Sequence, residues 1–178
     1  NVGSDELNRA FDDIGARNNA YTSSEVTCFY AHALPERLGR ATELVARMLR
    51  PALRLDDFDT EKNVILEEIA MYQDSPFWVL YEHATERHFK DSPVGHRVLG
   101  TKDTISEMSC DAMRTYFQRR YSADNTVVAF AGRLDFDRAV AQIQDLCGHW
   151  SATAAVREPS PTDVGAGAFT LREKNVNR

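Results

Sequence analysis

The sequence lacks the features that mark membrane-spanning, disulfide-stabilised and nucleic-acid-binding proteins. No apolar stretch approaches the length that spans a bilayer. Lysine and arginine form no run or stripe, and the formal net charge is −6, which argues against nucleic acid or an anionic membrane as the main partner. The three cysteines, Cys28, Cys110 and Cys147, are far apart, so the sequence indicates neither a disulfide framework nor a thiolate zinc site.

The composition is that of a globular chain. Hydrophobic residues make up 43% of it and aromatic residues 10%, which is enough for the core of one domain. Because the strand-like segments are grouped away from a block of helices, the sequence predicts an α+β fold of two layers, with helices packed on one face of a largely antiparallel sheet. Helices are predicted over residues 4–14, 35–50, 57–74, 77–88, 109–117 and 136–150, and strands over 16–22, 26–33, 126–131 and 169–178.

The ends of the chain predict an incomplete domain. The sequence starts at Asn1, directly at the beginning of a predicted helix, and stops inside the strand-like run 169–178. We therefore interpret residues 1–178 as one domain excerpted from a longer polypeptide, with the Ala-, Ser-, Pro- and Gly-rich segment 151–167 as a linker or long loop within it. The compartment is left unknown, because a targeting segment would lie outside such an excerpt.

Two carboxylates occupy unusual positions in the predicted helix 57–74. At about 100° per residue, with Glu61 at zero, Glu68 falls at about 340°, so both lie near the middle of an apolar arc that also contains Val64 and Met71. Lys62 and Glu67 lie on the polar side. Burying an ionised carboxylate is costly unless a cation, a metal or hydrogen-bond donors compensate. Structural alternatives remain open on periodicity alone: Glu61 could meet the positive end of the helix dipole, and Glu68 could pair with a buried arginine.

The first arm of the predicted hairpin, 16–22, is polar for a core strand. It contains Asn18 and Asn19, which suit the edge of a sheet. An edge strand presents N–H and C=O groups that can pair with an extended peptide whatever its sequence. An ordinary structural edge strand is the alternative interpretation.

Three segments occur in an order that is typical of one peptidase family. They are E-L-N-R-A-F-D-D-I-G-A-R-N-N-A-Y-T-S-S-E-V-T-C-F-Y-A, then E-K-N-V-I-L-E-E-I-A-M-Y-Q-D-S-P, then D-S-P-V-G-H-R-V-L-G-T. Together they resemble the pitrilysin/insulinase family of zinc peptidases, which includes the mitochondrial processing peptidase. The resemblance implies the N-terminal catalytic domain, without its first strands, of a zinc-dependent metalloendopeptidase that hydrolyses peptides or unfolded protein segments. It also implies a second homologous half or subunit that closes over the substrate like a clamshell.

The resemblance assigns roles to both carboxylates. The family belongs to the inverzincins, in which an H-x-x-E-H motif supplies two histidine ligands and a general base, and a later glutamate completes the zinc site. By similarity, Glu68 of V-I-L-E-E is that metal ligand, and Glu61 supports catalysis. The sequence departs from the pattern because it contains no H-x-x-E-H. We therefore expect that the helix with this motif is missing, and that the chain is inactive as it stands and binds zinc weakly or not at all.

A similar arrangement of histidines does not replace the missing motif. In H-A-T-E-R-H, with His83 at zero, Glu86 falls at about 300° and His88 at about 140° around a regular helix. Three side chains so spread cannot converge on one ion. We interpret the two histidines as core or surface residues.

The resemblance also assigns a substrate-binding role to the predicted hairpin. Family members bind the substrate as an added strand beside the zinc, and the matching residues here are Asn19, Ala20, Tyr21 and Thr22. A function from another class remains as the alternative: a non-catalytic paralogue that serves as a scaffold or as the substrate-gripping half. Such halves usually lose their metal ligands, so the presence of Glu68 favours the peptidase.

Overall fold

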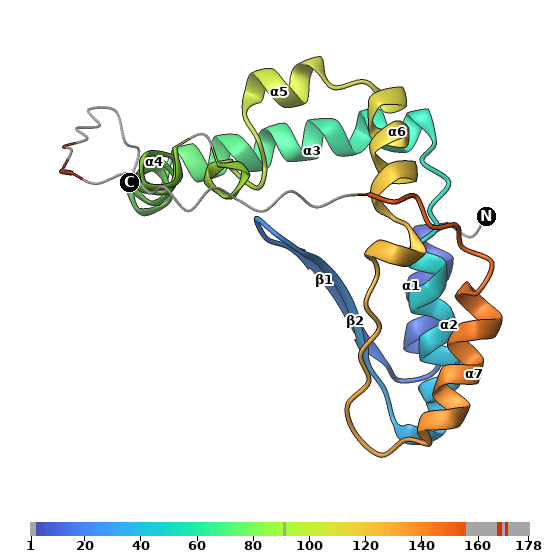
Figure 1. Ribbon diagram of the computed structural model, residues 1–178. Coiled ribbons are helices and arrows are strands. Elements are labelled where there is room, and N and C mark those ends of the chain that lie inside the picture. The colour runs from blue at the N-terminus through green and yellow to red at the C-terminus, as the bar shows by residue number, and fades with distance from the viewer. Residues whose placement is uncertain (1–2, 91, 156–166, 169, 171–178) are drawn as a thin grey trace. The chain divides into compact units, whose positions relative to one another are not determined.

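The computed structural model describes residues 3–90, 92–155, 167–168 and 170, and these form two compact units. We call residues 3–21, 27–52 and 113–155 the hairpin unit, and residues 22–26, 53–90 and 92–112 the long-helix unit. Figure 1 shows that helices dominate the chain and that the strands form one hairpin. Within the described residues, no helix combines the length and the apolar character needed to cross a membrane.

The hairpin unit places helices against one face of two strands. In order along the chain it contains α1 (Ser4–Asp12), β1 (Arg17–Thr22), β2 (Thr27–His32), η1 (Pro35–Arg37), α2 (Leu38–Met48), η3 (Ala123–Asn125) and α7 (Phe136–Cys147). Helix α2 packs against β2, α1 and α7.

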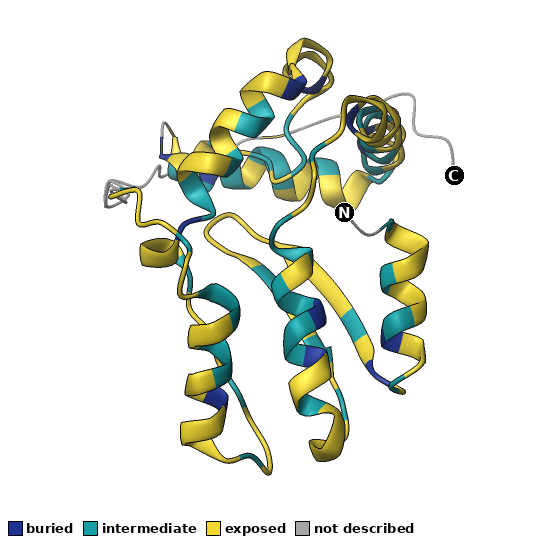
Figure 2. Cartoon of the chain, turned by 90° about the vertical axis from the view of Figure 1, so that its right-hand side faces the viewer, coloured by how far each residue is buried: buried dark blue, intermediate teal, exposed yellow. Residues whose placement is uncertain are grey.

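The core of this unit forms where the first helix meets the hairpin and α2. Phe11 and Leu44 are fully buried there with Ala16, and they contact Ala31 of the second strand and Ala33 just after it. The buried positions lie on the sides of α1 and α2 that meet the hairpin (Figure 2). This is the packing of helices on one face that the α+β prediction requires, and that prediction is confirmed.

The long-helix unit is built around α3 (Leu55–Gln73). Helix α4 (Pro76–Phe89) and the short α5 (Lys102–Glu107) both pack against it, and η2 (Pro93–Gly95) packs on α4. The buried residues of this unit include Phe58, Ile69, Ile105 and Cys110. The last of these begins α6 (Cys110–Arg120), whose C-terminal part belongs to the hairpin unit.

The predicted helices and the predicted hairpin are present, with two differences. The sequence analysis missed α5, and its strand at 126–131 is wrong, because that segment has no regular structure. Apolar composition alone does not make a strand: the sheet of the described residues contains only β1 and β2, and Val127 is 93% exposed. The predicted strand 169–178 and most of the segment 151–167 lie outside the described residues.

Candidate active-site cleft

Helix α3 carries both predicted carboxylates, but its buried face differs from the predicted one. The buried residues are Phe58 and Ile69, which lie about 60–80° around the helix from Glu61 at 100° per residue. Glu61 is exposed, whereas Glu68 is half-buried at the margin of the buried face. The prediction that both carboxylates lie on the buried side is therefore wrong for Glu61.

The packing of α3 on α5 explains the rotated face. Lys62, which the helical wheel placed on the polar side, is half-buried, and its Nζ donates to the backbone oxygens of Ser106 (2.6 Å) and Met108 (3.0 Å). A lysine can bury its aliphatic chain while its ammonium group meets acceptors. Val64 and Met71, which the wheel placed in the apolar arc, are 50% and 62% exposed.

Glu68 lines a cleft on the long-helix unit. This cleft has a volume of about 560 Å³. No ion pair or hydrogen bond engages the Glu68 carboxylate within the part of the chain that the structure describes. The cleft is lined by the hairpin turn (Thr22, Ser23, Ser24), by α3 (Glu68, Tyr72), by α4 (Trp78, Tyr81, Glu82, Thr85) and by the loop from Gly95 to Leu99.

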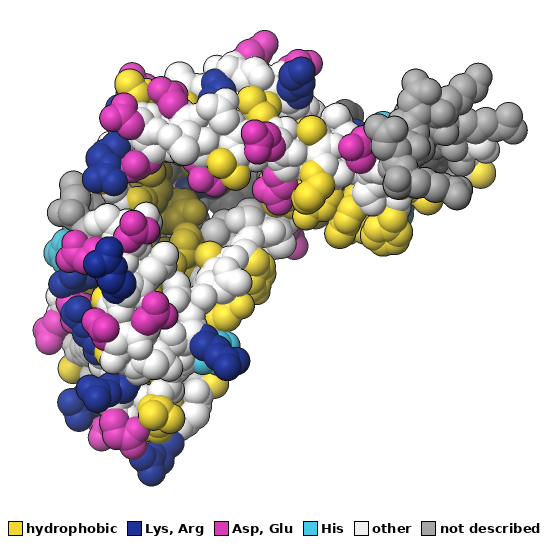
Figure 3. All heavy atoms as spheres, turned by 180° about the vertical axis from the view of Figure 1, so that it is seen from behind, with side chains coloured by type: hydrophobic (Ala, Val, Ile, Leu, Met, Phe, Trp, Pro, Cys, Tyr) yellow, Lys and Arg dark blue, Asp and Glu magenta, His cyan; other side chains and the backbone are white. Residues whose placement is uncertain are grey.

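One wall of the cleft is aromatic. The rings of Tyr72 and Trp78 meet edge to face at 5.3 Å, and those of Trp78 and Tyr81 at 5.8 Å. Both α4 residues keep much of their surface exposed, 41% for Trp78 and 55% for Tyr81. Figure 3 shows hydrophobic side chains gathered on the surface of this unit. Aromatic surface that remains open beside a carboxylate suits a ligand with both apolar and polar groups.

An arginine joins the loop of the cleft to α4. Arg97 donates through Nε to Glu86 at 2.6 Å, and its Nη1 lies 3.3 Å from a carboxylate oxygen of Glu82. The hydrogen bond from Arg97 is the main cause that lowers the pKa of Glu86, and His83, at 3.3 Å, contributes in the same direction. The two glutamates are four residues apart on α4, so one guanidinium joins the loop to a single helix face.

A tight turn brings this loop to the end of α4. The buried Ser92 accepts a hydrogen bond from Val94 N at 3.4 Å and begins η2. Gly95 is also buried, and a Cβ at this position would lie 3.1 Å from Phe89 Cβ and 3.3 Å from Lys90 O. A Cβ here would require Phe89 or the Lys90 carbonyl to shift by a few tenths of an ångström, so glycine favours the turn that brings Arg97 to the helix.

The structure brings two of the predicted site residues together. Thr22, at the hairpin turn, and Glu68, on α3, line the same cleft. Glu61 is exposed two turns earlier on α3 and is not among the residues that line the cleft. Asn19, Ala20 and Tyr21 lie on β1, in the hairpin unit, and all three are exposed.

The described residues do not by themselves complete a zinc site. They contain no group of three histidine, cysteine, aspartate or glutamate side chains that could hold a metal ion. A catalytic zinc needs three protein ligands and an open position for water. The cleft also contains Glu82 and His96, but Glu82 is paired with Arg97. Glu68 therefore has the chemistry and the free carboxylate for one ligand, and the remaining ligands would have to come from elsewhere.

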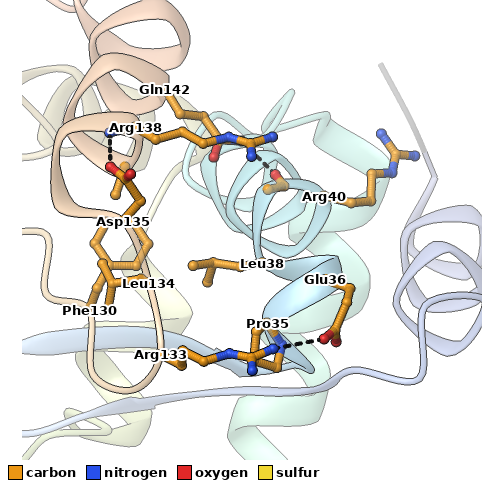
Figure 4. Close-up of a pocket in the computed structure, with 12 residues that line it drawn as sticks. Pro35, Glu36, Leu38, Arg40, Phe130, Arg133, Leu134, Asp135, Arg138 and Gln142 are labelled. Carbon is orange, nitrogen blue, oxygen red and sulfur yellow. Dashed lines mark hydrogen bonds and ion pairs between the residues drawn. The ribbon is translucent and has the colours of Figure 1, made fainter.

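The second cavity, in the hairpin unit, has a volume of about 520 Å³ between the beginnings of α2 and α7. Several of its polar groups are paired with one another (Figure 4). Arg133 lies 3.0 Å from Glu36, Gln142 Nε2 donates to Gly39 O at 2.6 Å, and the Asp135 carboxylate caps α7. These contacts are those of a structural joint between two helices, and we do not assign a function to this cavity.

The sequence analysis missed the aromatic wall and the arginine. The apolar residues of α4 served only to predict a helix over 77–88, but none of the residues of α4 is buried, and Phe77 and Leu80 are 66% and 52% exposed. Periodicity identifies a helix but does not tell which apolar faces find a partner. For Arg97 a signal existed, because Glu82 and Glu86 form an acidic pair at i, i+4 that suits a cation from another segment.

Two family models match the chain. Residues 1–102 match the model described as Insulinase (Peptidase family M16), and residues 107–178 match the model described as Peptidase M16 inactive domain. An uncharacterized zinc protease of Mycobacterium leprae is 38% identical over 97% of this chain and 40% of its own length. Another, from Streptomyces coelicolor, is 34% identical over 94% of this chain and 36% of its own length. The chain thus spans about two fifths of these curated relatives.

Solved structures show the same fold at lower identity. A protease from Helicobacter pylori superposes with a TM-score of 0.81 at 20% identity, covering 90% of this chain and 41% of that one. A putative M16-like peptidase from Alicyclobacillus acidocaldarius gives a TM-score of 0.76 at 21% identity, over 90% of this chain and 37% of that one. At these identities the likeness concerns the fold alone.

Proposed function

The chain belongs to the insulinase family, peptidase family M16, and from this premise we propose that it forms part of a zinc-dependent metalloendopeptidase that hydrolyses peptides or unfolded protein segments. The observation that carries the proposal is the position of Glu68: a half-buried carboxylate without a protein partner among the described residues, in a cleft beside an aromatic wall. A carboxylate so placed is available to a cation. The names of the curated relatives, zinc proteases, support the choice of metal.

The cleft residues and the predicted substrate strand have separate proposed roles. Glu68 is one zinc ligand in the complete site, where the metal would supply an activated water. Trp78 and Tyr81 provide apolar surface for a substrate side chain, and the outer edge of β1, from Asn19 to Thr22, pairs with the substrate backbone. Because Glu61 is exposed and outside the cleft, it is kept only as a supporting residue whose contact would come from a part of the protein beyond the described residues.

The complete enzyme would need more than this chain. The sequence contains no H-x-x-E-H, and the described residues offer no complete metal site. We propose that the chain alone is inactive, that the missing ligands belong to a longer polypeptide, and that a second homologous half or subunit encloses the substrate. One similar structure is described as the first half of the periplasmic protease PqqL from Escherichia coli, which gives a precedent for such halves.

The first test compares Glu68→Gln with Glu67→Gln in the longest polypeptide whose coding sequence contains this chain. Glu67 is adjacent and exposed, so its substitution controls for loss of charge on α3. We expect Glu68→Gln to lose bound zinc, measured by atomic emission, and at least about 100-fold of peptide hydrolysis, since even residues that only support a metal ligand cost 10–100-fold. If Glu68→Gln keeps the same zinc content and the same rate of peptide hydrolysis as Glu67→Gln, Glu68 is not a metal ligand.

A second candidate function is a non-catalytic half that grips substrate or serves as a scaffold. The match of residues 107–178 to a domain described as inactive favours it. The coding sequence upstream of Asn1 distinguishes the two: an H-x-x-E-H there supports the peptidase, and a degenerate motif supports the scaffold.

A further inference from the structure

The hairpin has a defined register, which fixes the direction of each backbone group of β1. Ser23 N donates to Val26 O at 2.8 Å in the turn, and the strands on its two sides are of equal length. The same register places Tyr21 opposite Cys28, and the contact of these two side chains raises the pKa of Tyr21. In an antiparallel pair, alternate residues direct their N–H groups to the partner strand and away from it. Asn19 and Tyr21 therefore pair with β2, and Ala20 directs its N–H to the outer edge.

That outward N–H already has an acceptor within its own strand. Ala20 N donates to Asn19 Oδ1 at 2.8 Å. Both residues are exposed, so nothing buried forces the contact. Asparagine is one of the few side chains that can offer such an acceptor to a neighbouring backbone N–H, since its amide is short and polar.

We propose that Asn19 is a positioning residue that caps the Ala20 N–H and competes with the substrate backbone for it. This inference rests on the proposed addition of substrate as a strand along the outer edge of β1. Before a peptide carbonyl can accept from Ala20, Asn19 Oδ1 must give up that donor. The cap keeps the edge from pairing with unrelated strands. The same contact weakens the binding of every substrate.

The free-energy cost of breaking the hydrogen bond between Ala20 N and Asn19 Oδ1 sets how much the affinity for a peptide is reduced. A neutral hydrogen bond is worth about 1 kcal/mol net, which corresponds to roughly five-fold in a dissociation constant. Removing the cap should therefore tighten peptide binding by about this factor. A carboxylate in place of the amide is a stronger acceptor for a backbone N–H and should weaken peptide binding by more.

The first experiment tests the cap without any catalytic activity. Amide hydrogen exchange of Ala20, followed by NMR in this chain, is compared between the wild type, Asn19→Ala and Asn19→Gln. The glutamine variant retains an amide but moves its oxygen one carbon farther from the Ala20 N–H. We expect several-fold faster exchange at Ala20 in both variants. Equal exchange in the wild type and Asn19→Ala would overturn the proposal.

The second experiment tests the competition. Binding of fluorescein-labelled β-casein, an unfolded protein, is measured by thermophoresis on the longest polypeptide that contains the chain. The proposal requires binding to tighten about five-fold in Asn19→Ala and to weaken in Asn19→Asp, with the weakening relieved as the introduced carboxylate is protonated below about pH 4. Unchanged affinities in both variants contradict it.

The two proposals fail in different ways. If the affinities shift as expected but the protein hydrolyses no peptide, the peptidase assignment falls and the role of Asn19 stands. If the protein hydrolyses peptides while both variants bind casein like the wild type, the role of Asn19 falls and the peptidase stands. A protein that binds no casein overturns the inference together with the proposed substrate edge.

Discussion

Arg97 is the residue that joins the loop of the candidate cleft to α4. Its side chain is 19% exposed and meets both Glu82 and Glu86. Exposed ion pairs contribute up to about 1 kcal/mol, and breaking a fully buried pair costs about 3–5 kcal/mol. This partly buried pair should lie between these limits. Because the same arginine borders the cleft, its loss would affect ligand binding as well as stability.

We predict that Arg97→Met lowers the free energy of unfolding by about 2 kcal/mol at pH 7. Methionine keeps most of the aliphatic packing and removes the charge. Arg97 holds the pKa of Glu86 below its ordinary 4.5, so this stabilisation is present above pH 4.5 and is lost as the pH falls below it. Urea unfolding at several pH values should therefore show a difference that shrinks in acid.

The matched control for this prediction is Arg54→Met. Arg54 forms an ion pair with Asp57 at 2.8 Å, but their side chains are 55% and 61% exposed. Such a pair is screened by solvent, and we expect a change below about 0.5 kcal/mol. A loss of stability in Arg97→Met no larger than in the control, or one that does not depend on pH, would show that the loop is not held by this arginine.

At the scale of the element, the orientation of α3 shows what a helical wheel cannot decide. The wheel counted apolar residues and placed Lys62 with the polar side, but the end of α5 offers two backbone acceptors to its ammonium group. The last carbonyls of a helix need partners, and a cation there is favoured by the helix dipole. Because Lys62 contacts the end of α5, the packed face of α3 is rotated away from Glu61, which is exposed to solvent.

Helix α5 was not predicted from the sequence, and the reason is physical. It has only six residues, too few to establish a periodicity. Its start depends on Gly100, at φ +75°, and on a reciprocal pair of hydrogen bonds between Thr101 and Thr104. Threonine replaces the glutamate or glutamine of the usual capping pattern, so the sequence signature was absent although the physical device is present.

We predict that Lys62→Met detaches α5 from α3. The variant keeps the aliphatic stem and removes the donor to Ser106 O and Met108 O, which should cost about 1.5–3 kcal/mol for charged hydrogen bonds. Backbone amides of α5 should exchange faster with solvent, measured by hydrogen–deuterium exchange. Lys102→Met is the control, because Lys102 is exposed at the N-terminal end of α5, where a cation gains nothing from the helix dipole. Equal exchange of α5 in the two variants would contradict the prediction.

At the scale of the whole molecule, the sequence predicted what local patterns determine. The helices follow from periodicity, and the hairpin follows from two strand-like arms around Ser23–Ser24–Glu25. The likeness to a peptidase family selected Glu68 as a metal ligand, which stays a prediction, and the predicted burial of the two carboxylates is confirmed in part for Glu68 and wrong for Glu61. The exposure of the aromatic wall and the lack of regular structure at 126–131 depend on which surfaces pack against other segments. Such packing involves residues far apart in the sequence, so a local pattern does not predict it.

The segment 126–131 leads to a prediction about the assembly of this chain. Its sequence, T-V-V-A-F-A, is apolar and uncharged, its residues form no ladder with the described strands, and Val127 is 93% exposed. Segments of this composition pair readily with strands of other molecules. We expect concentration-dependent self-association of the chain in sedimentation velocity, and we expect Val127→Lys to reduce it, because a charge on an exposed strand opposes edge pairing. Val140→Lys is the control, since Val140 is 51% exposed but lies on α7, whose backbone is paired within the helix. If both variants reduce the association equally, general hydrophobicity and not this segment drives it.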